Sequence, residues 1–235
     1  MIIEGAIAVK SALLNHKRTV EKVYIRRDKK TKDFNYIRKL LNTMNIEKIE
    51  MPKEDLDLLL AGKSHGGIGA VVSQRKDDEF DEGDIFYLDG IEDPFNLGYS
   101  MRTLYALGVK NVLLSTRDYS MMEAQLLKSS AGAYDMLNVK VAQDPLKEIE
   151  EYKNQGYYLY ALYRGEQAKD IFDVTFENKA LFMLGGEKRG ISSQLLSLSD
   201  QQLYISYGSD FRNALNACGA LDVVVTLLRN QRKKI

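Results

Sequence analysis

The chain has 235 residues, of which 45% are hydrophobic and 28% charged, and this composition indicates a folded globular protein rather than a disordered one. Its 33 basic and 33 acidic residues balance, so bulk charge does not indicate a nucleic-acid partner, although local basic patches can still bind phosphate. The single cysteine, Cys218, excludes an internal disulfide, and with only His16 and His65 it cannot form a conventional zinc site. We therefore expect no metal cofactor.

The first residues lack a basic segment followed by an apolar one. No uncharged apolar run approaches the roughly 20 residues that span a bilayer. The sequence therefore predicts a cytoplasmic protein.

The N-terminal part alternates short helical and extended patterns. Helices are expected at 5–14, 34–44 and 53–62, and strands at 20–25, 46–51 and 68–73. Together they predict a small α/β domain over residues 1–75. The charge-dense run at 76–84 has no usable apolar period and predicts an exposed linker.

Residues 85–235 are expected to form a second domain, in which strands and helices alternate regularly. The predicted strands are 84–90, 110–115, 136–141, 157–163, 180–186 and 202–207, and the predicted helices are 97–108, 122–132, 145–156, 192–199 and 213–231. Such alternation favours an α/β fold with a parallel sheet covered on both faces. Ligands of such sheets bind beyond the carboxyl ends of the strands, so the loops after Leu88, Leu184 and Ile205 are candidates for the site.

The first of these loops is DGIEDPFNLGYSMRTLYALG. Pro94 and Asn96 indicate a turn, and Gly98 is expected to begin a helix whose free N–H groups attract an anion. Arg102 follows one turn later and can reach the same place. A simpler interpretation is that Asn96 caps the helix and Arg102 pairs with Asp93.

The second loop, LGGEKRGIS, follows a buried strand, and its glycines let a ligand approach the backbone closely. Its spacing matches neither a dinucleotide-binding fingerprint nor a phosphate-binding P-loop, so an ordinary strand-to-helix turn is the alternative. The third loop leads into a helix with Asn213 as the expected N-cap and Asn216 in its first turn. Two asparagines there suggest a polar ligand, unless Asn216 caps a neighbouring backbone group.

In order and spacing, these loops resemble the three signature motifs of the SpoU-type (TrmH-like) RNA 2′-O-ribose methyltransferases of the SPOUT class. The first is D-x-x-x-D-P-x-N-x-G-x-x-x-R-T-x-x-x-x-G at 89–108, the second G-x-E-x-x-G-I/L at 185–191, and the third I-x-x-G…x-L-N at 205–216. KSSAGA at 128–133 also looks like a family segment. Residues 1–75, which contain HGGIGAV, resemble the ribosomal-protein-like RNA-binding domain that often precedes this fold.

The resemblance implies a deep trefoil knot, a homodimer packed around the knotted region, and S-adenosylmethionine as cofactor. It places the catalytic residues at Arg102, Asn96, Glu187 and Asn216. It places the cofactor-binding residues at Leu184, Gly185, Gly186, Glu187, Gly190, Ile205, Leu215 and Asn216. In the family, Arg102 is the candidate for handling the ribose hydroxyl. Because arginine stays protonated, holding the adjacent phosphate is the more conservative role.

Two positions depart from the family pattern. Gly186 stands where many members have asparagine, and Ala214 stands where they have serine. The cofactor pocket should tolerate both, so they put substrate positioning or rate in question.

The RNA, which the resemblance implies is ribosomal or transfer RNA, needs local positive charge. Arg26, Arg27, Lys29 and Lys30 form the densest basic run of the first domain, although such runs are often solvated loops. A second basic cluster, at 229–234, is explained equally well as a helix end whose charge complements the helix dipole. The alternatives to a methyltransferase are a catalytically inactive RNA-binding or ribosome-assembly protein with the same fold, and an unrelated nucleotide-binding α/β enzyme.

Overall fold

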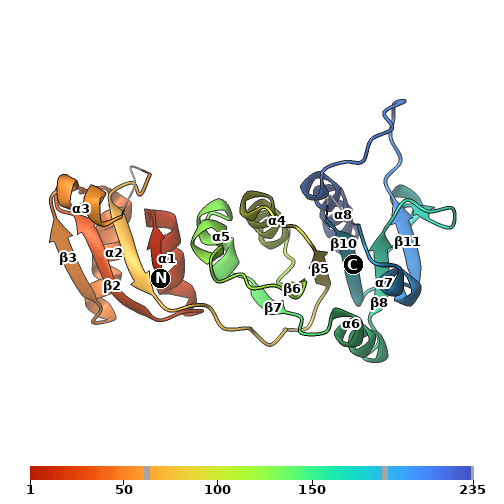
Figure 1. Ribbon diagram of the computed structural model, residues 1–235, viewed down its shortest axis with the longest axis horizontal. Coiled ribbons are helices and arrows are strands. Elements are labelled where there is room, and N and C mark those ends of the chain that lie inside the picture. The colour runs from red at the N-terminus through yellow and green to blue at the C-terminus, as the bar shows by residue number, and fades with distance from the viewer. Residues whose placement is uncertain (61–63, 187–189, 234–235) are drawn as a thin grey trace. The chain divides into compact units, whose positions relative to one another are not determined.

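A computed structural model describes residues 1–60, 64–186 and 190–233 (Figure 1). The chain forms two compact units. The N-terminal unit is Met1–Lys76 with Tyr119–Met136, and the C-terminal unit is Asp77–Asp118 with Leu137–Ile235. Residues 119–136 thus leave the run of strands and helices in which the sequence places them and fold with the N-terminal residues. Within the described residues, none of the helices is long and apolar enough to cross a membrane.

The N-terminal unit is built on a four-stranded sheet in the order β1-β4-β2-β3. β1 and β2 each pair antiparallel with β4, and β3 pairs parallel with β2. Its elements are β1 (Ile2–Glu4), α1 (Ala6–Asn15), β2 (Val20–Arg26), α2 (Lys32–Thr43), β3 (Glu47–Met51), α3 (Lys53–Leu59), β4 (Ile68–Val72), α5 (Glu123–Ser129) and the 3-10 helix η1 (Ala133–Asp135).

Apolar residues at helical spacing build the core of this unit. Phe34, Ile37 and Leu41 are buried along one face of α2, as their spacing predicts. Val23 and Ile25 of β2 alternate with more exposed neighbours and are fully buried.

The C-terminal unit contains a seven-stranded sheet in the order β7-β6-β5-β10-β8-β11-β9. Every pairing among its strands is parallel, which confirms the predicted sheet. Its elements are β5 (Ile85–Asp89), α4 (Pro94–Ala106), β6 (Asn111–Leu114), β7 (Asn138–Val141), α6 (Pro145–Asn154), β8 (Tyr158–Leu162), β9 (Lys169–Asp170), the 3-10 helix η2 (Ile171–Asp173), β10 (Ala180–Gly185), α7 (Ser193–Leu198), β11 (Gln201–Tyr204) and α8 (Ala217–Arg232).

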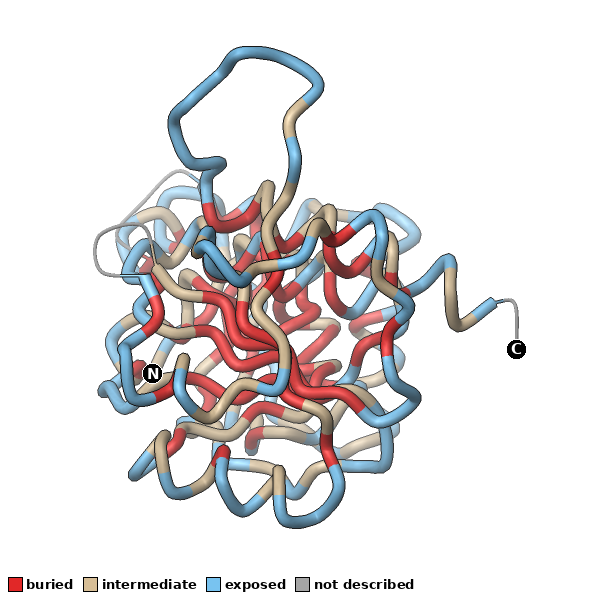
Figure 2. Tube along the Cα trace, turned by 90° about the vertical axis from the view of Figure 1, so that its right-hand side faces the viewer, coloured by how far each residue is buried: buried red, intermediate tan, exposed pale blue. Residues whose placement is uncertain are grey.

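The central strands of this sheet are buried on both faces. Ile85 and Tyr87 of β5 pack with Ile149 of α6 and Leu195 of α7. Residues between them point to the other face, where Phe86 stacks on the ring of Phe182 at 4.9 Å. Figure 2 shows this buried interior and one long exposed segment that projects from it, which Figure 1 places between β11 and α8.

Two helix starts differ from the sequence prediction by three residues or more. α4 begins at Pro94, not Gly98, because the Asp93 carboxylate accepts hydrogen bonds from the N–H groups of Phe95 and Asn96, and proline suits the first helical turn. α8 begins at Ala217, and Asn216 rather than Asn213 is its N-cap.

The charged run after the first sheet lies along β7. The Asp78 N–H donates to the carbonyl of Val139 at 3.0 Å, and the Asp77 carboxylate accepts from the N–H of Val141 at 3.2 Å. Phe80 stacks on Tyr152 with 6.0 Å between ring centroids. This segment therefore packs on the C-terminal unit. Its charge density predicted an exposed linker and gave no sign of the hydrogen bonds to β7.

Candidate functional site

A cavity of about 580 Å³ lies at the carboxyl end of β10, in the C-terminal unit. It is lined by Leu162, Leu184, Gly185, Gly186, Gly190, Ala214, Leu215, Asn216, Ala217 and Ala220. The second and third signature loops therefore meet at one place, as expected for strands whose carboxyl ends share a sheet edge.

Two glycines allow the backbone to close tightly on one side of this cavity. A Cβ atom on Gly185 would lie 2.2 Å from the carbonyl carbon of Gly190, and one on Gly186 would lie 2.2 Å from the carbonyl oxygen of Gly90. Gly190 has φ 62°, a left-handed conformation that glycine adopts without strain. The Gly190 N–H donates to the Gly186 carbonyl at 3.0 Å. The departure at Gly186 therefore has a steric reason in this chain.

The first turn of α8 forms the opposite wall. The Asn216 side chain accepts a hydrogen bond from the Cys218 N–H at 2.8 Å, which is the capping role weighed as an alternative to ligand binding. Asn216 nevertheless lines the cavity, so capping fixes its place there. Ala217 and Ala220 follow at a spacing of three residues and leave space because their side chains are small.

Sequence reasoning missed Leu162, Ala217 and Ala220 as cavity residues. Leu162 ends β8 and pairs in register with Leu184 of β10. The order of the strands in the sheet decides that neighbour, and no local pattern encodes it. The small residues at the start of α8 were a usable signal, but the late start of the helix concealed it.

The first signature loop reaches the same helix. The Cys218 thiol donates to the Asn96 carbonyl at 3.2 Å, and the Ser100 hydroxyl lies 3.4 Å from the same sulfur. The first turn of α4 therefore packs against the turn of α8 that lines the cavity. Arg102 is exposed on α4, six residues after Asn96, which is about 9 Å along a helix axis.

The remaining two residues of the predicted cofactor-binding set differ in what the structure describes of them. Ile205 follows the end of β11 and is not among the lining residues. Glu187, predicted for both catalysis and cofactor binding, lies outside the described residues.

The predicted RNA-binding residues lie in the N-terminal unit, at the end of β2. Arg26 forms an ion pair with Asp28 at 2.6 Å, while Arg27 and Lys30 are exposed. The backbone of this turn is fixed, because the Arg38 guanidinium donates to the Lys29 carbonyl at 2.7 Å. The basic run is thus an ordered surface turn.

Asp89 ends β5 beside the glycine loop, and burial raises the pKa of its carboxyl although a hydrogen bond from Tyr87 opposes the shift. A raised pKa in the folded state means that ionisation costs stability, and that this cost appears as pH rises above the unfolded value of about 4. Asp89→Asn is therefore expected to raise the free energy of unfolding at pH 7 and to change it little at pH 3. Urea unfolding at both pH values measures this, and equal or lower stability of the variant at pH 7 would contradict it.

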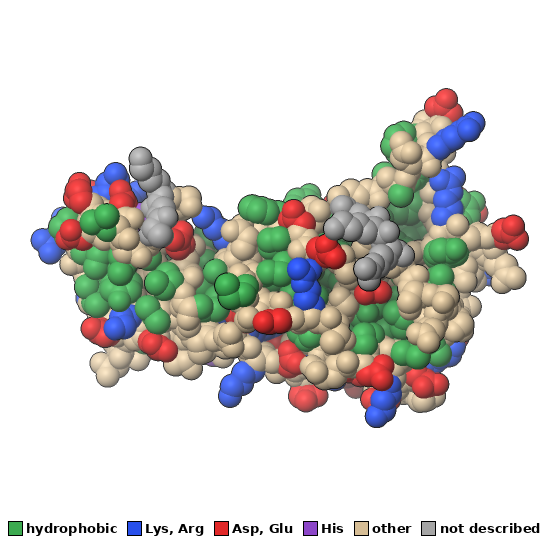
Figure 3. All heavy atoms as spheres, in the orientation of Figure 1, with side chains coloured by type: hydrophobic (Ala, Val, Ile, Leu, Met, Phe, Trp, Pro, Cys, Tyr) green, Lys and Arg blue, Asp and Glu red, His purple; other side chains and the backbone are tan. Residues whose placement is uncertain are grey.

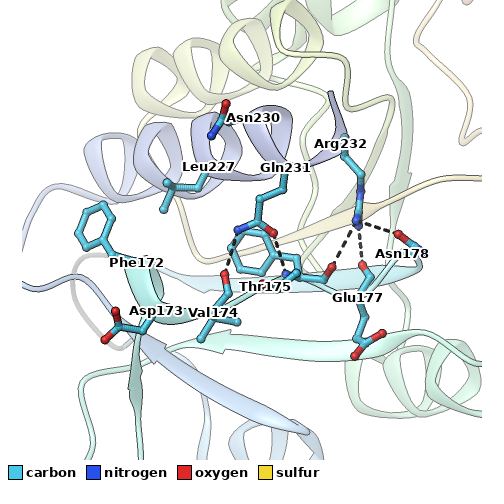
Figure 4. Close-up of a pocket in the computed structure, with 11 residues that line it drawn as sticks. Phe172, Asp173, Val174, Thr175, Glu177, Asn178, Leu227, Asn230, Gln231 and Arg232 are labelled. Atoms are coloured by element: carbon cyan, nitrogen blue, oxygen red, sulfur yellow. Dashed lines mark hydrogen bonds between the residues drawn. The ribbon is translucent and has the colours of Figure 1, made fainter. Parts of the chain in front are cut away.

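A larger cavity, of about 710 Å³, lies at the other end of α8 (Figure 4). There Gln231 donates to the Val174 carbonyl at 2.9 Å and accepts from the Phe176 N–H at 2.8 Å. Arg232 pairs with Asp84 at 2.9 Å, so this basic residue anchors the helix end. Among the described residues, none from the three signature loops lines this cavity, so it is not the candidate site.

Two family profiles together match most of the chain. The profile of the SpoU rRNA methylase family matches residues 84–226, and that of the RNA 2′-O ribose methyltransferase substrate-binding domain matches residues 2–77. A protein of Staphylococcus haemolyticus assigned to the TrmH family of tRNA/rRNA methyltransferases is 26% identical over 246 aligned residues, covering 100% of this chain and 97% of the relative.

Solved structures show the same fold. The SpoU methyltransferase AviRb of Streptomyces viridochromogenes, in complex with its cofactor AdoMet, superposes with a TM-score of 0.79 at 20% identity, covering 99% of this chain and 90% of that one. A TrmH-family protein of Porphyromonas gingivalis superposes with a TM-score of 0.80 at 20% identity, covering 99% of this chain and 89% of that one.

S-adenosylmethionine is the cofactor that the family uses. The family profile covers most of the chain, and the second and third signature loops converge on one cavity. The chain belongs to the SpoU/TrmH family of RNA methyltransferases.

Proposed function

We propose that the protein methylates a ribose 2′-hydroxyl of ribosomal or transfer RNA, with S-adenosylmethionine bound in the cavity at the end of β10. The observation that carries the proposal is the convergence of the glycine loop and the start of α8 on this cavity. Six of the eight residues expected to bind the cofactor line it: Leu184, Gly185, Gly186, Gly190, Leu215 and Asn216.

The residues present suit this cofactor. The volume of about 580 Å³ lies in the range of sites for small molecules and cofactors. Gly185 and Gly186 expose backbone groups to the cavity, Leu162, Leu184 and Leu215 provide apolar walls, and Asn216 supplies a polar group. When bound, S-adenosylmethionine supplies an electrophilic methyl group on a sulfonium sulfur.

The protein's own residues would position the ribose. The ribose 2′-hydroxyl would face the methyl group that the cofactor supplies, and its proton would pass to phosphate or water. In this proposal Arg102 holds the adjacent phosphate and orients the hydroxyl, because a guanidinium stays charged and donates in a fixed fork. Asn96, Asn216 and Glu187 would fix the geometry, and no metal takes part.

The N-terminal unit would bind the RNA through Arg26, Arg27, Lys29 and Lys30. The match of residues 2–77 to a substrate-binding domain supports this role. We also infer that the C-terminal domain forms a deep trefoil knot, that two chains form a homodimer through that region, and that the protein is cytoplasmic.

Calorimetric titration with S-adenosylmethionine, followed by methyl transfer to ribosomal and transfer RNA and mapping of 2′-O-methyl groups, tests the function. Binding with transfer would support it. Ala214 in place of serine and the capping role of Asn216 leave one competing function, a catalytically inactive RNA-binding protein with the same fold. RNA binding without cofactor binding or methyl transfer would favour this competing function.

Ala220→Phe is expected to abolish measurable cofactor binding, because the added ring would occupy the cavity that Ala220 lines. The matched control is Ala106→Phe, since Ala106 is exposed in the last turn of α4. Calorimetry on both variants gives the comparison. If Ala220→Phe binds S-adenosylmethionine with wild-type affinity and circular dichroism shows an intact fold, the cofactor does not bind in this cavity.

A further inference from the structure

We propose that two exposed segments beside the cavity, residues 163–164 and 207–212, form a subsite for a single strand of RNA. In this subsite Phe211 stacks on a nucleobase, and Arg164 and Arg212 contact phosphates. The inference rests on the proposed function and assigns part of its substrate contact to the C-terminal unit.

Both segments adjoin the cavity along the chain. Tyr163 and Arg164 directly follow Leu162, the lining residue at the end of β8. Residues 207–212 directly precede the third loop's contribution to the lining, which begins at Ala214. A ligand held by these segments therefore lies next to the place where the methyl group would be transferred.

Tyr207 gives the projecting segment a fixed shape. Its hydroxyl donates to the Asn213 carbonyl at 3.1 Å and accepts from the Leu215 N–H at 3.1 Å. The Arg164 guanidinium carbon lies 5.6 Å from the centre of the Tyr207 ring, and the Phe211 ring lies 5.9 Å from it. Tyr207 thus joins the two segments and presents an aromatic ring and a cation beside each other.

The side chains that would meet the RNA are exposed. Phe211 is 52% exposed and Tyr163 is 44% exposed, and Arg164 and Arg212 are also exposed. Figure 3 shows basic, acidic and hydrophobic side chains together on the projecting segment. Exposed aromatic rings interleaved with arginines are the groups that single-stranded RNA binds, by stacking and by phosphate contact.

The charges near the two arginines indicate that stacking contributes more to RNA affinity than phosphate contact does. Asp210 and Glu166 are exposed in or next to the same segments, so their charges offset those of the two arginines. Long-range attraction of the phosphate backbone is therefore weak here. Removing the Phe211 ring should weaken binding more than removing one arginine charge.

Fluorescence anisotropy with a labelled single-stranded 12-nucleotide RNA tests the subsite in the full chain, at fixed salt and with S-adenosylhomocysteine present. Phe211→Ala is expected to weaken binding by at least about fivefold, the lower bound for losing one stacked base. Phe211→Tyr should restore binding, because it keeps the ring, whereas Phe211→Leu should not. Arg164→Gln and Arg212→Gln should each reduce the salt dependence of binding, whereas Arg229→Gln, an exposed control in the last turn of α8, should not.

Three results would overturn the subsite. The first is a wild-type protein that does not bind the RNA, and the second is a Phe211→Leu variant that binds the RNA as tightly as the wild type does. The third is a Phe211→Ala variant whose RNA affinity is unchanged while its sedimentation coefficient changes, which would assign the ring to contact with a second copy of the chain. Calorimetry with S-adenosylmethionine on the same variants separates this inference from the proposed function. A variant that loses RNA binding but keeps its affinity for the cofactor would support the subsite. A wild-type protein that binds no cofactor would instead contradict the proposed function.

Discussion

Replacing Arg102 with alanine is expected to reduce methyl transfer by about two to three orders of magnitude, the usual effect of removing one group that positions or stabilises the transition state. Arg102 is exposed on α4, and the first turn of that helix contacts α8 beside the cavity. It does not line the cavity, so affinity for S-adenosylmethionine should stay nearly unchanged. Single-turnover transfer to RNA and calorimetry measure the two quantities separately.

The matched control for this experiment is Arg229→Ala, which removes an exposed arginine from the last turn of α8. It should keep wild-type turnover. Arg102→Lys also tests the role, because lysine keeps the charge but loses the planar fork that holds phosphate in two places. Wild-type turnover in Arg102→Ala would remove Arg102 from the mechanism, and loss of cofactor affinity would make it a structural residue instead.

Replacing Arg18 with methionine is expected to destabilise the N-terminal unit by about 3–5 kcal/mol, because it leaves buried carboxylates without their main partner. The Arg18 guanidinium lies 2.7 Å from Glu123 and 2.8 Å from Asp135, and the side chains of Arg18 and Asp135 have no solvent exposure. Arg75, 3.7 Å from Asp135, offsets only part of the loss. Urea unfolding with hydrogen exchange of peptides from residues 1–76 and 119–136 measures the effect.

An exposed pair in the same unit provides the control for Arg18. Arg26→Met removes an ion pair to Asp28, whose side chain is 69% exposed, and should leave the free energy of unfolding nearly unchanged. The triple variant Arg18→Met, Glu123→Gln, Asp135→Asn should recover part of the stability, because its buried groups carry no charge. Equal stability of Arg18→Met and Arg26→Met would contradict a buried ionic link between α5, η1 and the N-terminal residues.

The sequence by itself determined most of the elements and the three loops of the candidate site, although it did not predict β1 and β9. Alternation of strands and helices predicted a parallel sheet, because buried parallel strands are apolar throughout and need helices on both faces. Gly185 and Gly186 marked a close backbone approach, since a Cβ atom would collide there, and Gly190 marked a left-handed turn. Six of the residues expected to bind the cofactor line the cavity, Ile205 does not, and Glu187 lies outside the described residues.

Tertiary structure decided what depends on partners distant in the chain. The sheet order placed Leu162 beside Leu184, and the start of α8 at Ala217 turned Asn216 into a cap that also lines the cavity. Residues 119–136 joined the N-terminal unit because Glu123 and Asp135 pair with Arg18, more than 100 positions away. Local pattern and propensity carry no information on such partners, because burial and ion pairing are settled only when the whole chain packs.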